Sequence, residues 1–318
     1  MGSQSTLQRN RLLSRVSSLY YEKGINQQEI SDRLGVSRSG ISRILKQARD
    51  EGVVKISIIQ PPSMYHELEY ALETKYGLKE AIVIDVDQPE SRDAIQHHIG
   101  LAAGEYFLRI IKPGDIVGLA WGRTMYEFVS SIHSVKCENV HIVQLLGGLG
   151  PPESNVHSSA ICSRLAYSLG CPYTLLPSPG VAGSLESKGA FLSDSYVSNA
   201  LDLIKKVNLA FVSVGNAAED CLAMLLNIIT PKDRLYLINS GAVGDIDLRY
   251  YDIVGNPVHS NFDERVIGAD LEQFKQYDRV VGLAGGDEKY EAIQGVLNGK
   301  YINVLITNYQ LARKLVEN

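Results

Sequence analysis

The sequence predicts an α/β protein in two parts, an N-terminal helix-turn-helix head and a larger Rossmann-like domain built on a parallel sheet. Three observations lead to this prediction. Residues 27–46 contain two short amphipathic helical segments joined by a glycine, apolar strands alternate with helical segments from residue 81 onward, and the net charge changes sign between the two parts. With 318 residues, 45% of them hydrophobic, the chain can bury two separate cores.

The head is expected to contain three helices. The second begins after Asn26 and presents Ile30 and Leu34 on one face. Gly35 can adopt the positive φ that a tight turn between helices requires, and Ser37 is a suitable N-cap for the third helix. The apolar stripes of the first and third helices consist of Leu12, Leu13, Val16, Leu19 and Tyr20, and of Ile41, Ile44 and Leu45.

The outer face of the third helix is rich in groups that can donate hydrogen bonds to phosphates or base edges. Such residues are often merely solvated, but residues 1–60 hold ten Lys or Arg against five Asp or Glu, a net charge of +5. Because the whole chain carries −5, residues 61–318 carry −10. A basic head on an acidic body is typical of a nucleic-acid-binding module fused to another domain. The residues expected to contact double-stranded DNA are Gln27, Ser37, Arg38, Ser39, Ser42, Arg43 and Lys46.

A domain boundary is expected just after the head. Residues 53–58 are β-branched and partly alternating, which predicts a strand leading out of a winged-helix-like head. Pro61 and Pro62 then interrupt regular structure, because neither can donate a backbone hydrogen bond. The sequence therefore predicts a DNA-binding domain at 1–60 and a second domain at 61–318. The latter begins with a helix at 64–76, which packs in the core or pairs two protomers.

The second domain is expected to contain a parallel sheet covered on both faces. Its strands are apolar along their whole length and are separated by segments long enough for helices. Residues 249–260 differ, because Gly255 to Pro257 favour a turn in a small hairpin or strand pair outside the main sheet. The predicted parallel strands are 81–85, 115–121, 141–146, 173–176, 209–214, 279–284 and 303–307.

Glycines follow three of these strands where ligands commonly bind in α/β sheets. They lie at 122, at 147–148 and at 285–286, and Arg123 and Thr124 follow the first of them. A glycine lets backbone amides approach a phosphate, and an arginine can bind a phosphate through two parallel hydrogen bonds. Glycines after strands are also common simply because the chain must turn there. Three such sites in one sheet favour a phosphorylated ligand.

Two charged residues occupy similar positions. Asp245 follows a glycine-rich turn, and Lys289 opens the helix after Gly285 and Gly286. A carboxylate can accept hydrogen bonds from sugar hydroxyls, and a lysine can bind a phosphate, a hydroxyl or a carbonyl oxygen. Asp245 is equally well explained as a capping or turn residue, and Lys289 as a solvated helix start. The residues alone leave this choice open.

Other classes of protein are disfavoured. No apolar run approaches the length of a membrane span, and the N-terminus lacks the layout of a signal peptide. The four cysteines have no paired spacing, so we expect reduced thiols in a cytoplasmic protein. The seven histidines are scattered, and no metal site or cofactor is expected.

Five segments resemble the SorC family of bacterial transcriptional regulators, which comprises SorC/DeoR-type sugar-responsive repressors and activators. The resemblance covers nearly the full chain. The motif GAVGDI at 241–246 and the segment LAGGDEKYEAIQGVLNGKYINVLITN at 283–308 are its most specific parts. The other segments lie at 19–54, 114–125 and 142–150.

The resemblance implies a DNA-binding head and an effector domain similar to phosphosugar isomerases and deaminases, in a tetramer that binds operators near sugar-uptake or catabolic genes. It assigns residues 122–124, Gly147 and Gly148 to the phosphate pocket, and Asp245 and Lys289 to the sugar portion. One departure concerns Leu145 and Leu146, which stand where some relatives have hydroxyl-bearing residues. The expected effector-binding residues are Gly122, Arg123, Thr124, Gly147, Gly148, Asp245, Gly285 and Lys289.

Two functions are compatible with these features. The first is a transcriptional regulator of a carbohydrate uptake or catabolism operon, controlled by a phosphorylated sugar. The second is an active sugar-phosphate isomerase or deaminase with an appended DNA-binding head. Enzymatic chemistry would require a second acid or base beside Asp245, and no residue has that obvious role. The sequence therefore favours a regulator rather than an enzyme.

Overall fold

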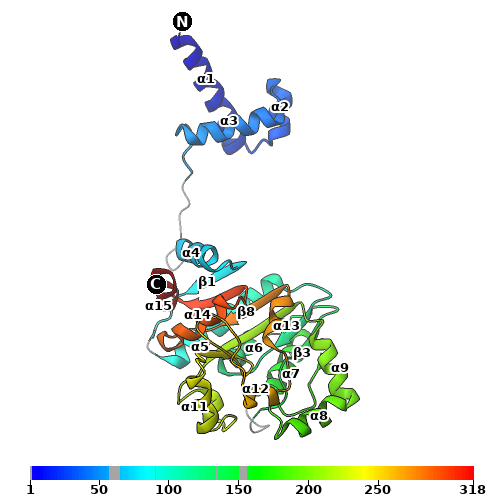
Figure 1. The fold of residues 1–318 in the computed structure, drawn as a ribbon. Coiled ribbons are helices and arrows are strands. Elements are labelled where there is room, and N and C mark those ends of the chain that lie inside the picture. The colour runs from blue at the N-terminus through cyan, green and yellow to red at the C-terminus, as the bar shows by residue number, and fades with distance from the viewer. Residues whose placement is uncertain (1, 57–64, 90, 134, 150–155) are drawn as a thin grey trace. The chain divides into compact units, whose positions relative to one another are not determined.

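The computed structural model describes residues 2–56, 65–89, 91–133, 135–149 and 156–318. The chain forms two compact units, a head (Met1–Pro62) and a body (Ser63–Asn318). Figure 1 shows a helical head and a body in which helices surround a sheet. The predicted break at Pro61 and Pro62 lies outside the described residues. Of the helices that are described, none is long and apolar enough to cross a membrane.

The head has the predicted helix-turn-helix. Asn26 caps the second helix by accepting the Glu29 amide at 3.0 Å, and Ser37 caps the third by accepting the Gly40 amide at 3.1 Å. Gly35 ends the second helix with a φ of 65°, the left-handed conformation that glycine adopts most easily. The head comprises α1 (Gly2–Ser17), a π-helical turn (Ser18–Glu22), α2 (Gln27–Leu34) and α3 (Arg38–Asp50), around a core of Val16, Ile30, Ile41 and Leu45.

The strand predicted at 53–58 is not formed over residues 53–56, and residues 57–58 lie outside the described part. This part of the prediction is wrong. Val53 is 43% exposed and Ile56 is 60% exposed. An alternating apolar pattern gives a strand only where a neighbouring strand accepts its backbone hydrogen bonds, and the described head is helical.

The body contains the predicted parallel sheet. Its strand order is β1-β9-β8-β5-β2-β3-β4, and every neighbouring pair is parallel. All seven predicted strands are present, although β4 has only two residues. The strands are β1 (Glu80–Ile84), β2 (Ile116–Leu119), β3 (His141–Gln144), β4 (Tyr173–Thr174), β5 (Leu209–Asn216), β8 (Arg279–Leu283) and β9 (Val304–Asn308).

The chain reverses its direction across the sheet between β2 and β5. From β2 it continues outward through β3 and β4, whereas from β5 it continues the opposite way through β8 and β9. Such a switch point leaves a crevice at the carboxyl ends of the two strands. The helices of the body are α4 (His66–Tyr76), α5 (Arg92–Ile110), α6 (Arg123–Ser131), α7 (Ser158–Leu169), α8 (Leu185–Ser193), α9 (Ser195–Ile204), α10 (Leu222–Leu225), α11 (Pro231–Asn239), α12 (Asn261–Arg265), α13 (Leu271–Gln276), a 3-10 turn η2 (Asp287–Lys289), α14 (Tyr290–Asn298) and α15 (Tyr309–Glu317).

Two helices that border this crevice pack closely because one of them carries glycines. A Cβ atom on Gly100 of α5 would lie 2.4 Å from the Cβ of Glu127 in α6. A Cβ on Gly104 would lie 2.1 Å from the Oγ of Ser131. Behind them, Phe128 of α6 stacks on Phe211 of β5 with ring centroids 4.6 Å apart. The start of α5 is thereby held beside the start of α6 and the end of β5.

A small antiparallel hairpin extends the sheet at the end of β5. It consists of β6 (Gly244–Ile246) and β7 (Arg249–Tyr251), and Asp245 pairs with Gly215 of β5. The prediction of a hairpin off the main sheet is therefore confirmed, but the predicted position of its turn, near Gly255, is wrong. The chain turns at Asp247 and Leu248, with φ of 49° and 64°, as two-residue hairpin turns require. The predicted turn near Gly255 gives only an isolated bridge between Tyr251 and Pro257.

Candidate functional site

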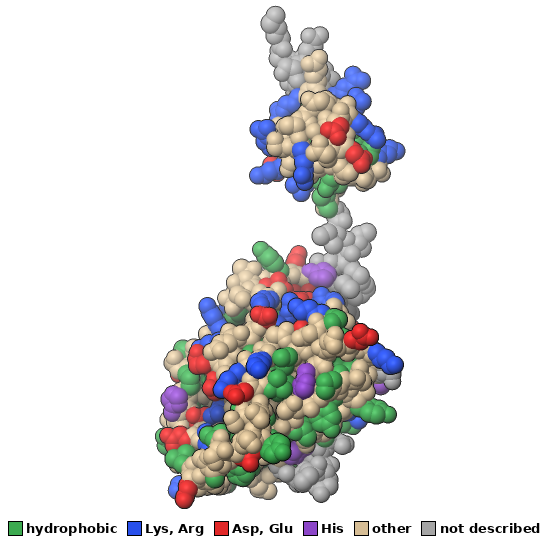
Figure 2. Space-filling model, turned by 90° about the vertical axis from the view of Figure 1, so that its right-hand side faces the viewer, with side chains coloured by type: hydrophobic (Ala, Val, Ile, Leu, Met, Phe, Trp, Pro, Cys, Tyr) green, Lys and Arg blue, Asp and Glu red, His purple; other side chains and the backbone are tan. Residues whose placement is uncertain are grey.

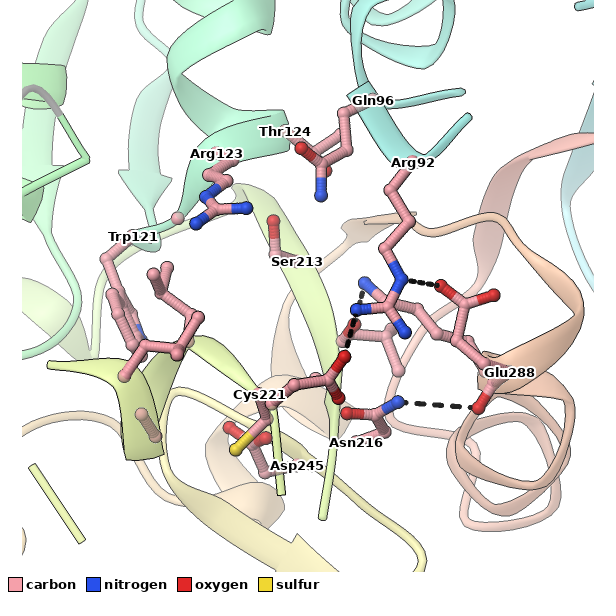
Figure 3. Close-up of a pocket in the computed structure, with 18 residues that line it drawn as sticks. Arg92, Gln96, Trp121, Arg123, Thr124, Ser213, Asn216, Cys221, Asp245 and Glu288 are labelled. Carbon is pink, nitrogen blue, oxygen red and sulfur yellow. Dashed lines mark hydrogen bonds and ion pairs between the residues drawn. The ribbon is translucent and has the colours of Figure 1, made fainter. Parts of the chain in front are cut away.

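The crevice between β2 and β5 contains a cavity. The space inside its lining, including the open mouth, is about 830 Å³. Its walls come from the ends of β2 and β5, the starts of α5 and α6, the hairpin, and residues 220–225 and 288–289 (Figure 3). The lining residues are Arg92, Gln96, Trp121, Gly122, Arg123, Thr124, Ser213, Val214, Gly215, Asn216, Asp220, Cys221, Leu222, Ala223, Leu225, Asp245, Glu288 and Lys289.

One end of the cavity is suited to an anion. Gly122 precedes α6 with a φ of 120°, which only glycine adopts readily, and no side chain caps the first amides of this helix. Arg123 forms no ion pair or hydrogen bond with any described residue. The hydroxyl of Ser213 is buried and also has no partner in the described part of the chain. Free amides at a helix N-terminus and an unpaired guanidinium together favour a phosphate.

Asp245 lines the cavity from the hairpin, which it also stabilises. It is 7% exposed, and its Oδ2 accepts the Leu248 amide at 2.9 Å. Its Oδ1 faces Gly215, where an added Cβ would lie only 2.1 Å away. Burial raises the pKa of Asp245 to about 6, against the opposing effects of the Leu248 amide and Lys289. The two sequence interpretations of Asp245 are thus compatible, because one oxygen caps the turn while the residue lines the cavity.

Lys289 lies at the end of η2 near Asp245. Its Nζ donates a hydrogen bond to the carbonyl oxygen of Val214 at 2.8 Å. Burial lowers the pKa of Lys289, whereas Glu288 and Asp245 act to raise it. A cation held this way has donors left for a hydroxyl or carbonyl oxygen of a ligand.

The rim of the cavity carries an ion-pair cluster that the sequence did not reveal. Arg92, in the first turn of α5, contacts Asp220 at 2.5 Å and Glu288 at 3.1 Å. The side chain of Asn216 donates to the Glu288 carbonyl at 3.4 Å. These residues come from three distant segments, at 92, 216–220 and 288, and follow no local motif. Of these residues, only Arg92 could have been proposed from the sequence as a site residue, because it follows a predicted strand and opens a helix, as Arg123 does.

Three predicted effector residues are not among those that line the cavity. An added Cβ on Gly147 would lie 2.5 Å from the carbonyl oxygen of Pro179, and Gly148 forms a bridge with the same residue. A Cβ on Gly285 would lie 2.7 Å from Asn308, Ile95 and Ile99. These close approaches give the glycines a packing role, and their contact with an effector stays a prediction.

In the head, the predicted DNA-contacting residues lie on α2 and α3. Gln27 is half-buried at the start of α2, and the others are exposed. The hydroxyl of Ser37 caps α3 and also contacts the hydroxyl of Ser39 at 3.2 Å, and Nε of Arg43 donates to the carbonyl oxygen of Ser39 at 3.4 Å. The side chains of Arg38, Ser42 and Lys46 are exposed and form no hydrogen bond with a described residue. Figure 2 shows Lys and Arg side chains distributed over this unit.

No group of three or more His, Cys, Asp or Glu side chains among the described residues is arranged to hold a metal ion. Cys221 lines the cavity, and burial raises the pKa of its thiol, so the thiol stays neutral near pH 7. With Trp121, Leu222 and Ala223 it forms an apolar wall.

Comparisons with known proteins match both units. Residues 60–317 match the family described as "Putative sugar-binding domain", and residues 14–51 match region 4 of sigma-70. The deoxyribonucleoside regulator of Bacillus subtilis (strain 168) is 32% identical over 98% of this chain and 99% of its own. The sorbitol operon regulator of Klebsiella pneumoniae is 30% identical over 96% and 98%.

The crystal structure of the full-length sorbitol operon regulator SorC from Klebsiella pneumoniae is similar in fold. It superposes with a TM-score of 0.74 at 29% identity and covers 96% of this chain and 99% of its own. These relatives are transcriptional regulators, which confirms the expectation of a regulator over that of an isomerase or deaminase.

Proposed function

The chain belongs to the SorC/DeoR family of sugar-binding transcriptional regulators, and we propose that it controls a carbohydrate uptake or catabolism operon in response to a phosphorylated sugar. Its head is a DNA-binding helix-turn-helix, and its body is a sugar-binding effector domain. The names of two relatives, a deoxyribonucleoside regulator and a sorbitol operon regulator, support a sugar-related effector.

The polarity of the cavity is the observation that carries the proposal. Within the described part of the chain Arg123 has no partner and the start of α6 has no side-chain cap, which favours a phosphate at this end. Asp245, Asn216 and Gln96 offer acceptors and donors for hydroxyl groups elsewhere in the cavity. A sugar phosphate combines these two kinds of group in one molecule.

Binding of the effector is proposed to alter the affinity of the head for operator DNA. Exposed donors on α3 would contact the major groove and flanking phosphates. If the sugar phosphate changes DNA affinity, the operator must change sugar phosphate affinity by the same factor. Titration of the sugar phosphate with and without operator DNA measures this reciprocity.

We expect the regulator to act as a homo-oligomer, a tetramer by family resemblance. Helix α8 has no buried residue although it carries Leu185, Phe191 and Leu192. Tyr167 and Tyr196 are 90% and 77% exposed, and Figure 2 shows hydrophobic side chains gathered on the lower part of the body. Such surfaces favour self-association, which brings two heads to a two-fold operator. A monomer in light scattering at working concentration would contradict this expectation.

The test of the effector site is calorimetry with a panel of phosphorylated sugars and their unphosphorylated forms. We expect one sugar phosphate to bind and its unphosphorylated form to bind far more weakly. Lys289→Ala and Asp245→Ala should abolish the effect of this ligand on DNA affinity while leaving DNA binding without ligand nearly unchanged. Lys206→Ala is the matched control. Lys206 is exposed and precedes the amino-terminal end of β5, whereas the cavity lies at the carboxyl end of that strand.

The two site variants should differ in a second respect. Asp245→Asn keeps the shape of the side chain and an acceptor oxygen, so it should weaken binding less than Asp245→Ala if the carboxylate only accepts hydrogen bonds. Wild-type affinity for every sugar phosphate in both alanine variants would remove this cavity as the effector site.

A further inference from the structure

Of the charged side chains that line the cavity, only Arg92, Asp220 and Glu288 form ion pairs within the described part of the chain. The lining contains three cations, Arg92, Arg123 and Lys289, and three carboxylates, Asp220, Asp245 and Glu288. Arg92 contacts two of the carboxylates at once, whereas Arg123 contacts none in the described part of the chain. Figure 3 shows Arg123 and Arg92 on different sides of the cavity. The lining is neutral in sum, but two of its cations have no ion pair with a described residue: Arg123 beside α6, and Lys289, which donates to the Val214 carbonyl oxygen.

We propose that the cavity selects a singly phosphorylated ligand whose far end is uncharged and carries hydroxyl groups, and that Asp220 and Glu288 exclude a second phosphate by occupying Arg92. This inference rests on the proposed function, since it concerns the effector of the same site. It restricts the ligand class to sugar monophosphates and disfavours sugar bisphosphates.

The physical reason is competition for one guanidinium. An arginine offers five N–H donors in a planar fork, and here Nη1 is directed to Asp220 and Nε to Glu288. A second phosphate would have to share Arg92 with these carboxylates, through the N–H donors that they leave, or displace them. The carboxylates would then remain beside it as like charges, with Asp245 as a third negative group in the same cavity.

Hydroxyl groups meet no such obstacle at this end. The side chains of Gln96 and Asn216 each offer an amide, and Asp245 keeps one oxygen that accepts no hydrogen bond in the described part of the chain. A neutral polyol can donate to the carboxylates without separating them from Arg92. The same cluster that disfavours a phosphate is therefore compatible with sugar hydroxyls.

The experiment is calorimetry with matched pairs of ligands on the full-length protein. The pairs are glucose 6-phosphate with glucose 1,6-bisphosphate, fructose 6-phosphate with fructose 1,6-bisphosphate, and ribose 5-phosphate with ribose 1,5-bisphosphate. In the pair that binds most tightly, the wild type should prefer the monophosphate by about tenfold or more, as expected from one like-charge contact near a protein surface.

Asp220→Asn combined with Glu288→Gln keeps the size of both side chains and removes their charges. This double variant frees Arg92, so its preference for the monophosphate should fall by about tenfold or reverse. Asp202→Asn is the control, because Asp202 is an exposed residue of α9 that pairs with Lys205 and does not line the cavity, so the preference should stay unchanged. Trp121 fluorescence reports whether each variant is folded.

The outcomes separate the two proposals. A wild type that binds the bisphosphate as tightly as the monophosphate, or a double variant with unchanged preference, would overturn the inference and leave the proposed function standing. Failure of every sugar phosphate in a wider panel to bind would overturn the proposed function, and the inference with it.

Discussion

Asp247 is a buried carboxyl group whose removal should stabilise the body at neutral and alkaline pH. It is 2% exposed, and neither of its oxygens has a hydrogen-bond partner in the described part of the chain. Burial raises its pKa to about 8, and the charge of Asp245 adds to this, while the Trp121 backbone and the charge of Arg249 act to lower it. Asp247→Asn removes the ionisable group, and asparagine readily adopts the φ of 49° found here.

The sign and size of the effect follow from the difference between the pKa of the folded and unfolded states. The unfolded carboxyl ionises near its ordinary pKa of 3.8, whereas the folded one holds its proton to about 8. Wild-type stability therefore falls as the pH rises from about 4 and levels off above about 8. At about 1.36 kcal/mol for each pKa unit, the advantage of Asp247→Asn should grow by on the order of 4 kcal/mol between about pH 5 and about pH 9.

The assay is urea unfolding of both proteins at these two pH values. Trp121 is the sole tryptophan, is 8% exposed and lies in the body, so its fluorescence follows the body without a contribution from the head. The free energies of unfolding of the two proteins should be nearest to each other at the lower pH and diverge at the higher one. A constant difference between them across this range would refute the assignment of a buried, proton-retaining carboxyl at this position.

The remaining predictions concern the head and the helix pair beside the cavity. Arg43→Ala should weaken operator binding and reduce its dependence on salt or its sequence selectivity, measured by fluorescence anisotropy at several salt concentrations; unchanged binding would remove Arg43 from the interface. Ile41→Ala should destabilise the head by about 2–4 kcal/mol, because Ile41 is fully buried, and circular dichroism of thermal unfolding measures this. Gly100→Ala should destabilise the body by about 1–3 kcal/mol by forcing α5 from α6, whereas Gly189→Ala, with open space around it on α8, should not; equal unfolding midpoints would contradict the packing argument.

The sequence predicted most of the body because strands buried on both faces are uniformly apolar. A run such as residues 209–214 has no alternative environment in a water-soluble fold, and it forms the centre of the sheet. The helix-turn-helix was equally predictable, because its caps depend on local sequence. Asn26 and Ser37 cap helices through amides three residues further along the chain, and Gly35 ends α2. Residues 53–56 show the limit of this approach, because a strand depends on a partner that a local pattern does not specify.

The hairpin turn was misplaced for a related reason. Gly255 and Pro257 are strong turn residues, and the chain does turn there, but only one bridge forms across it. The longer pairing is made by Gly244–Ile246 with Arg249–Tyr251, around a turn of two residues that are not glycine. Asp247 and Leu248 adopt positive φ because β6 must also pair with the end of β5. Tertiary pairing has here outweighed local turn preference.

For the site, five of the eight effector residues predicted from the sequence line the cavity, and the ion-paired residues that the fold brings together were not predicted. Residues 122–124, Asp245 and Lys289 all line the cavity. Arg92, Asp220 and Glu288 lie far apart in the chain, and no spacing rule connects them. They meet because three parts of the fold converge on the rim of the cavity. Packing of α5 against α6 places Arg92 there, the segment after β5 brings Asp220, and the segment after β8 brings Glu288.

The net charge of the head correctly predicted DNA binding, but the net charge of the body does not predict which ligand the cavity binds. A body with a charge of −10 would seem to repel a phosphorylated ligand. At physiological salt, however, charges more than about 8 Å away are largely screened, so most of that excess has little effect inside the crevice. The local balance is decided by the pairing of Arg92 with Asp220 and Glu288 and by the absence of a described partner for Arg123. An acidic domain can therefore bind an anion wherever its fold leaves one cation unpaired beside the N-terminus of a helix.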